Sequence, residues 1–128
     1  MPSKVYLNPD TMSQPRGFTN VVKVGHTAYI AGQVSATRDG SVVGKGDPEA
    51  QVRQIWHNIE AAVKSIGGTL QDVVKTTTYV TNISHAGAVR KVREELFATN
   101  PPTSTLLVVS GLASPDYMVE IEAVAVVE

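Results

Sequence analysis

Residues 119–127 read Val-Glu-Ile-Glu-Ala-Val-Ala-Val-Val, and this stretch decides the fold class. Successive side chains of a β-strand point to opposite faces, so Glu120 and Glu122 share one face with Val124 and Val126. The strand is therefore apolar on both faces for part of its length. Such a strand is covered on both sides, which predicts helices on one face of its sheet and neighbouring subunits on the other.

We expect two amphipathic helices, both of which precede this strand in the chain. Residues 47–67 place apolar side chains on one continuous stripe, with Asp47 as the N-cap and Gly67 as the stop signal. Residues 84–97 form the second helix, with Ser84 as its N-cap. An Asn-Pro-Pro sequence at 100–102 closes that segment, because a residue before proline avoids the helical conformation.

Short runs rich in Val, Ile and Thr supply the remaining strands. We expect strands at residues 20–24, 27–32, 72–81, 104–109 and 119–127, with a short additional strand at 42–43. The order is ββ(β)αβαββ. This order predicts an α/β (α+β) protein whose mixed sheet carries both helices on one face, in a single domain covering residues 1–128.

Charge and composition exclude several kinds of partner. The 128 residues contain 11 Lys and Arg against 12 Asp and Glu, for a formal net charge of −1. The densest basic cluster, Arg90, Lys91 and Arg93, alternates with apolar residues and runs into two glutamates, as on a solvated helix face. We therefore expect no nucleic-acid partner.

The absence of cysteine excludes disulfides, thiolate metal sites and cysteine nucleophiles. Residues 1–5 lack the apolar run of a signal peptide, and no stretch approaches the roughly 20 apolar residues of a membrane span. We expect a soluble, cytoplasmic protein with no membrane partner. The histidines His26, His57 and His85 are not spaced as metal ligands, so no metal site is predicted.

Glu120 is the strongest candidate for chemistry. Its carboxylate lies on a mostly apolar strand face, and poor solvation raises the pKa of a carboxyl group toward neutrality. Glu120 could then shuttle a proton or orient a water molecule. The alternative is a structural glutamate paired with a Lys or Arg across the sheet or a subunit interface. Glu122, nearer the middle of the strand, fits a structural or interfacial position better.

Three segments carry a family resemblance. Residues 29–33 read Tyr-Ile-Ala-Gly-Gln, residues 70–80 read Leu-Gln-Asp-Val-Val-Lys-Thr-Thr-Thr-Tyr-Val, and residues 119–126 read Val-Glu-Ile-Glu-Ala-Val-Ala-Val. These segments resemble, in the same order, signature segments of the Rid (reactive intermediate deaminase, YjgF-type) family. The resemblance runs from about residue 14 to residue 127.

The resemblance implies a chorismate-mutase-like fold and a homotrimer with three clefts between subunits. It also implies hydrolysis of small enamines and imines, such as species derived from 2-aminoacrylate, to ketoacids and ammonia without a metal or organic cofactor. In deaminating members an arginine after a Pro-Ala step binds the substrate carboxylate, and a glutamate on the last strand positions the attacking water. A tyrosine near the N-terminus and a serine of a Ser-Gly-Gln segment help to line the cleft.

This chain matches that set only in part. Glu120 falls on the water-positioning glutamate, and Gly32 falls on the glycine of Ser-Gly-Gln. The tyrosine position holds Phe18 and the serine position holds Ala31, and each replacement removes a hydroxyl group. We therefore expect a more apolar cleft than is usual in this family.

The arginine position holds Ser104, followed by Thr105. Neither Arg nor Lys occurs after Arg93, so a small error of alignment does not restore the cation. A guanidinium holds a carboxylate by a bidentate, charge-assisted pair, whereas hydroxyl groups offer weaker neutral hydrogen bonds. A neutral or less anionic substrate therefore fits better than the usual 2-aminoacrylate type.

Two functions remain open from the sequence. The first is an enzyme that acts on an enamine, imine or related small electrophile, by deamination, another hydrolysis or tautomerisation. The second is a non-catalytic, metabolite-binding or chaperone-like trimer, which the replaced cleft residues favour. Ribonuclease activity has been attached to relatives, but the sequence offers no basic groove or histidine pair for it.

Overall fold

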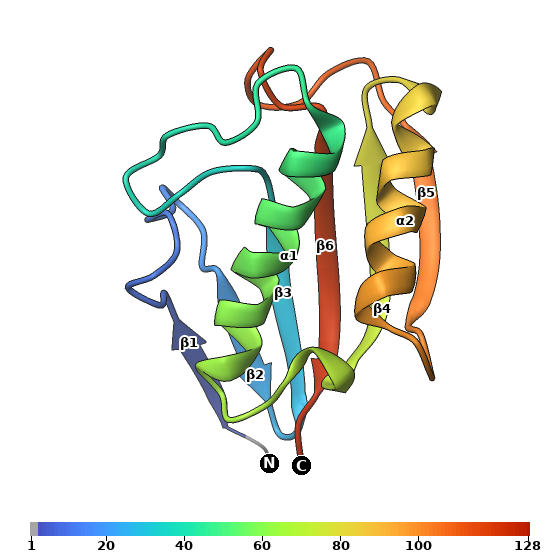
Figure 1. Cartoon of the computed structure of the whole chain (residues 1–128). Helices are drawn as coiled ribbons and strands as arrows, with labels where there is room; N and C mark the ends of the chain where they lie inside the picture. The colour runs from blue at the N-terminus through green and yellow to red at the C-terminus, as the bar shows by residue number, and fades with distance from the viewer. Residues whose placement is uncertain (1–2) are drawn as a thin grey trace.

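The computed structural model describes residues 3–128 and contains one six-stranded sheet in the order β1-β2-β3-β6-β4-β5 (Figure 1). Neighbouring strands are antiparallel except β4 and β5, which are parallel, so the predicted mixed sheet is confirmed. The strands are β1 (Lys4–Leu7), β2 (Val21–Val24), β3 (Thr27–Gln33), β4 (Val73–Val80), β5 (Thr103–Val108) and β6 (Val119–Val126).

Both helices, α1 (Pro48–Lys64) and α2 (Ala86–Leu96), cover the same face of the sheet, as predicted (Figure 1). Asp47 is the N-cap of α1 and accepts a hydrogen bond from the Ala50 N–H at 3.1 Å. The core lies between the helices and the inner face of the sheet. Neither helix within residues 3–128 is long and apolar enough to cross a membrane.

The second helix begins later than expected. Asn82, rather than Ser84, supplies the capping oxygen, which accepts the Ser84 N–H at 2.9 Å. A short 3-10 turn, η2 (Ile83–His85), follows, and α2 starts only after it. The prediction of Ser84 as the N-cap was wrong: Ser84 lies inside η2, and the N-cap of α2 is His85, whose side chain makes no capping hydrogen bond.

The third strand of the N-terminal half is β1 rather than the predicted strand at residues 42–43. The predicted strand at 42–43 is reduced to an isolated bridge between Ala36 and Val42, beside the turn at Gly40, whose φ is +86°. The sheet is instead extended by β1, which pairs with β2. The alternating Lys-Val-Tyr-Leu sequence of β1 suits an edge strand, whereas a glycine turn interrupts the other segment.

The face of the sheet opposite the helices is open and partly apolar. Tyr6, Tyr29, Leu107 and Val126 on this side are 61%, 54%, 46% and 36% exposed. Tyr29 is in register with Val124 of the central strand β6. Exposed apolar patches of this kind mark interaction surfaces.

Gln51 of α1 joins the helix to the segment that leads into β6. Its buried amide donates to the carbonyl oxygens of Gly44 and Asp116 at 3.1 and 2.9 Å and accepts the Met118 N–H at 2.9 Å. One side chain thus satisfies three backbone groups. This clamp fixes the chain two residues before Glu120.

Replacement of Gln51 by the similarly sized but apolar Met should lower the free energy of unfolding by about 3 kcal/mol, because buried backbone groups lose their partners. Urea unfolding measures this loss. His57→Met, at an exposed position of the same helix, is the control and should change stability by less than about 0.5 kcal/mol. Equal stability of the two variants would contradict the clamp.

Candidate functional site

Glu120 lies at the start of β6 on the open face of the sheet, in register with Tyr79 of β4. Its side chain is half-buried, and no hydrogen bond or ion pair to its carboxylate occurs within residues 3–128. Burial, and secondarily the charge of Glu122, raise its pKa above the usual 4.5. The sequence allowed the alternative that Glu120 is a structural glutamate paired with a Lys or Arg. Within one chain, this alternative is not observed.

Glu122, two residues further along the same face, has a different environment. It is exposed, and its Oε1 accepts a hydrogen bond from the Tyr79 hydroxyl at 2.9 Å. The same contact raises the pKa of the Tyr79 hydroxyl. Glu122 thus has a fixed partner, while the carboxylate of Glu120 is free to interact with a ligand.

Gly32 makes room for the Glu120 side chain. The pairing of β3 with β6 is irregular between Ile30 and Gln33, and Gly32 lies in this interruption. A Cβ atom at position 32 would overlap Oε2 of Glu120 and lie 2.9 Å from its Cδ. Glycine therefore permits the close approach of the Glu120 side chain rather than an unusual φ angle, and a larger residue here would displace the carboxylate.

A cavity of about 170 Å³ adjoins Gly32, and we call it the loop cavity. It lies between the N-terminal loop, the end of β3, helix α1 and the segment before β6. Phe18 lines this cavity together with Gly32, so two predicted site residues meet there. The complete lining is Ser13, Gln14, Pro15, Arg16, Phe18, Asn20, Gly32, Gln33, Val34, Ala36, Asn58 and Tyr117.

Arg16 also lines the loop cavity, and the sequence interpretation missed it. The family resemblance locates the substrate-binding arginine at Ser104. Arg16 lies about ninety positions earlier in the chain, and only the fold brings it near Gly32. The Pro-Arg-Gly-Phe sequence at 15–18 was the available signal, since it places a cation beside the predicted site residue Phe18.

The remaining predicted residues lie apart from the loop cavity. Ala31 is half-buried in β3, where its N–H donates to the Asn20 carbonyl oxygen at 2.9 Å. Ser104 is in register with the buried Thr76 and therefore faces the helix side, where its Oγ accepts a hydrogen bond from Arg93 at 2.8 Å. Within one chain, the Ser104 side chain does not share a face with Glu120.

Thr105 differs from Ser104 in this respect. It is in register with Thr77, which in turn is in register with Glu122 of β6. Side chains in register lie on the same face, so Thr105 faces the same open side as Glu120. Of the two hydroxyl residues at this point of β5, Thr105 is the one that can contribute to a site containing Glu120.

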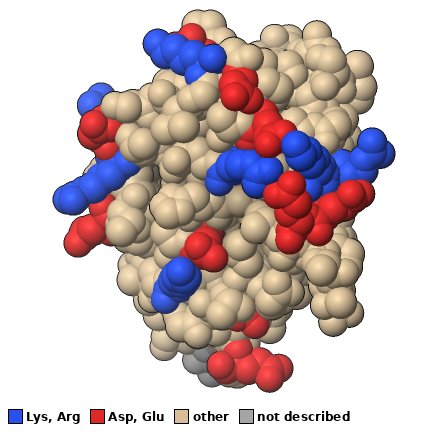
Figure 2. Space-filling model, in the orientation of Figure 1, with Lys and Arg blue, Asp and Glu red and all other residues tan. Residues whose placement is uncertain are grey.

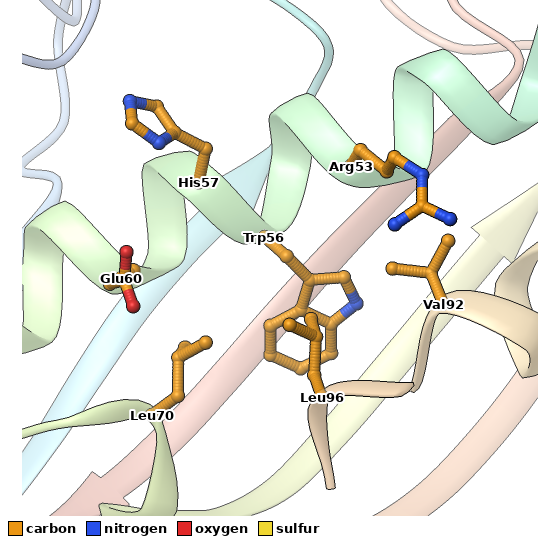
Figure 3. Close-up of a pocket in the computed structure, with 7 residues that line it drawn as sticks. All are labelled: Arg53, Trp56, His57, Glu60, Leu70, Val92 and Leu96. Atoms are coloured by element: carbon orange, nitrogen blue, oxygen red, sulfur yellow. The ribbon is translucent and has the colours of Figure 1, made fainter. Parts of the chain in front are cut away.

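A second hollow, of about 210 Å³, lies between α1 and α2 on the opposite side of the sheet (Figure 3). Trp56 forms its floor, is 3% exposed, and packs edge-on against Phe97 with ring centroids 5.2 Å apart. Trp56 is therefore a core residue. Arg53 at the rim is engaged by Glu49 and Glu95, and Glu60 lies 3.6 Å from Lys64, so the Arg and Glu side chains that line this hollow already have ion-pair partners.

Positive and negative side chains alternate over the helix face of the molecule (Figure 2). Lys91 and Arg53 both contact Glu49, and Lys45 lies 3.6 Å from Asp116. This face therefore presents no continuous basic surface. Within residues 3–128, no group of three His, Asp or Glu side chains is arranged to hold a metal ion.

Comparisons with known proteins agree with this architecture. Residues 10–127 match the family described as Endoribonuclease L-PSP. A RutC family protein of Pyrococcus abyssi is 31% identical over 108 residues, which cover 84% of each chain. A Rid-family protein of unknown function from Yersinia pestis has a TM-score of 0.91 at 30% identity, covering 98% of this chain and 100% of its own. RidA from the Antarctic bacterium Psychrobacter has a TM-score of 0.86 at 26% identity, covering 95% and 98%.

A six-stranded mixed sheet with two helices on one face places this protein in the α+β, chorismate-mutase-like class of the similar structures. Together with the sequence matches, this shows that the chain belongs to the Rid (YjgF) family. The resemblance drawn from residues 29–33, 70–80 and 119–126 is thereby confirmed. The resemblance had correctly indicated the fold as well as the family.

The raised pKa of Glu120 has a consequence for stability. Folding disfavours the ionised carboxylate, so ionisation of Glu120 lowers the free energy of unfolding. This loss of stability is absent below pH 4.5, grows as the pH rises from 4.5 and is complete once the pH has passed the folded-state pKa. Glu120→Gln should therefore stabilise the protein at pH 8 and have little effect near pH 4. Thermal unfolding at both pH values measures the difference, and a benefit of equal size at both would contradict burial of the charge.

Proposed function

We propose that this protein is an enzyme that hydrolyses, or transfers a proton within, an imine, enamine or related small electrophile, with Glu120 as the catalytic residue. The observation that carries the proposal is a half-buried carboxylate, without a partner in the described chain, beside the loop cavity. Its raised pKa makes it a stronger base than an exposed glutamate. Family membership supports the class of reaction.

In the hydrolytic version, Glu120 takes a proton from water as the water oxygen attacks the imine carbon. The C–O bond forms and the electron pair of the C=N bond moves to nitrogen. The protonated Glu120 then gives its proton to nitrogen, which yields a carbinolamine. Glu120 next takes the proton of the new hydroxyl group and delivers it to the amino nitrogen. The C–N bond breaks as the oxygen forms the carbonyl double bond, and a carbonyl compound and ammonia leave. This sequence consumes one water, regenerates the carboxylate and requires no cofactor.

The substrate should differ from the usual 2-aminoacrylate type. The hydroxyl groups expected at two cleft positions are absent at Phe18 and Ala31, and Thr105 offers only a neutral hydroxyl on the face of Glu120. The same replacements favour the alternative of a metabolite-binding trimer without turnover. RNA cleavage, which the family description names, fits less well, because Arg16 is the one cation among the described residues that line the loop cavity.

We further propose that the protein is a homotrimer in which neighbouring subunits cover the open face of the sheet. Tyr29 is 54% exposed there, beside the apolar positions Val124 and Val126. The family fold is generally oligomeric, which supports the proposal. Subunit contacts would also complete the surroundings of Glu120, since Glu120 lies on this face.

Glu120→Gln should lower turnover of imine substrates by a factor of about 10² to 10⁴, the usual contribution of a general base. The measurement is the release of carbonyl product from a panel of imines generated by amino-acid and amine oxidases. Glu122→Gln, a carboxylate replaced on the same strand face, is the matched control and should retain activity within a few fold. Unchanged turnover by Glu120→Gln would overturn the mechanism, and saturable binding without turnover would establish the binding alternative.

Tyr29→Lys should dissociate the trimer, because three lysine charges would be buried on the covered face. Sedimentation equilibrium measures the molecular mass of the variant. Ile83→Lys is the control: Ile83 is 63% exposed but lies in η2, outside the sheet. A Tyr29→Lys protein that folds and keeps the wild-type mass would refute coverage of this face.

A further inference from the structure

Arg16 is the single charged residue among the described residues that line the loop cavity. It is exposed and takes part in no ion pair within residues 3–128. By contrast, Arg53 is bound to two glutamates, and Arg93 donates to Ser104. The guanidinium of Arg16 is therefore available for an oxyanion, which guanidinium groups hold with two parallel hydrogen bonds.

The loop that carries Arg16 is tied down at both ends. The side-chain amide of Asn20 donates to the Ser13 carbonyl oxygen at 3.1 Å. The backbone N–H of Asn20 donates to Asn8 Oδ1 at 2.8 Å. Between these points Gly17 adopts a φ of +79°, a conformation that suits glycine, and turns the chain between Arg16 and Phe18. The cation is thus held near the cavity rather than on a free tail.

The rest of the lining is both apolar and polar. Pro15, Phe18, Val34 and Tyr117 supply apolar surface, no acidic side chain lines the cavity, and hydroxyl and amide groups come from Ser13, Gln14, Asn20, Gln33 and Asn58. Its volume of about 170 Å³ corresponds to about five or six water molecules, the size of a small metabolite. The ligand that fits this chemistry is small, carries one negative charge and can place a short chain against the apolar side chains.

Glu120 limits where that charge can lie. The carboxylate packs on Gly32 and does not itself line the loop cavity, so Glu120 and Arg16 bound different parts of the site. A negative group adjacent to the reacting carbon would be repelled by Glu120. A negative group at the other end of the substrate would instead meet the guanidinium of Arg16.

We infer that Arg16 binds a carboxylate remote from the reacting carbon, so that the substrates are imines or enamines of short oxo-acids whose acid group lies at the opposite end of the chain. This inference rests on the proposed function of Glu120. It also revises the expectation of a neutral substrate, because the cation missing from β5 has a counterpart on the N-terminal loop. Arg16 then determines specificity, and Glu120 performs the reaction.

The test compares three five-carbon imines generated in solution by oxidases. These are 5-iminopentanoate with a remote carboxylate, 2-iminopentanoate with an adjacent one, and the neutral imine of pentylamine. The wild-type protein should prefer 5-iminopentanoate. Arg16→Gln should raise KM for this imine about tenfold with little change in kcat, and should leave the pentylamine imine unaffected. Arg16→Lys should restore part of the affinity.

Arg38→Gln is the matched control, since Arg38 is exposed in a turn and does not line the loop cavity. It should behave as the wild-type protein with all three imines. Equal KM values of Arg16→Gln and wild type for 5-iminopentanoate would overturn the inference while leaving the proposed reaction intact. A wild-type preference for 2-iminopentanoate would overturn it as well.

Binding of 5-oxopentanoate, the product of hydrolysing 5-iminopentanoate, tests Arg16 without turnover. Calorimetry should show about tenfold weaker binding to Arg16→Gln than to the wild type, and the wild-type affinity should fall between 50 and 500 mM salt as the exposed charge is screened. Glu120→Gln should bind at least as tightly as the wild type. If no imine is turned over but binding still depends on Arg16, the proposed reaction fails and the anion site stands.

Discussion

Strand β6 is hydrogen-bonded to β3 on one side and to β4 on the other, and this double pairing is the constraint on which the structure depends. Its inner side chains Val119, Ile121 and Ala125 are fully buried under the helices. A shift of one residue would bring Glu120 into that core, so burial fixes the register strongly. The same register places Glu120 on the open face. The position of Glu120 is therefore fixed by the burial of its neighbours in the strand.

The surroundings of Glu120 are unfavourable to its charge, and this is what makes the position chemically interesting. The carboxylate packs on Gly32 and faces the like charge of Glu122, and both burial and that charge raise its pKa. The rest of the fold tolerates this local cost because the clamp of Gln51 and the packed core hold the start of β6 in place. Destabilised groups held by a stable scaffold are typical of functional sites.

Positive charge is distributed unevenly around this site. Strand β5, where deaminating relatives are expected to carry an arginine, offers Thr105 on the open face and turns Ser104 toward the helices. The guanidinium of Arg16 lies instead on the N-terminal loop and has no ion-pair partner within residues 3–128. Charge around a site is set by position in space rather than by position in the sequence, so a cation can come from a different segment of the same family scaffold.

The sequence by itself determined the fold class, both helices, the central strand and the strand face that carries Glu120, because these depend on periodicity, on the Asp47 cap and on segments that match the family. Only the tertiary structure decided the face of Ser104, the later start of α2 and the edge strand β1. It also decided the meeting of Arg16 with Gly32, which are distant in the chain, and the close approach of Glu120 to Gly32. The physical reason is that periodicity assigns side chains to faces, whereas strand pairing and loop anchoring determine which faces and which distant residues come together.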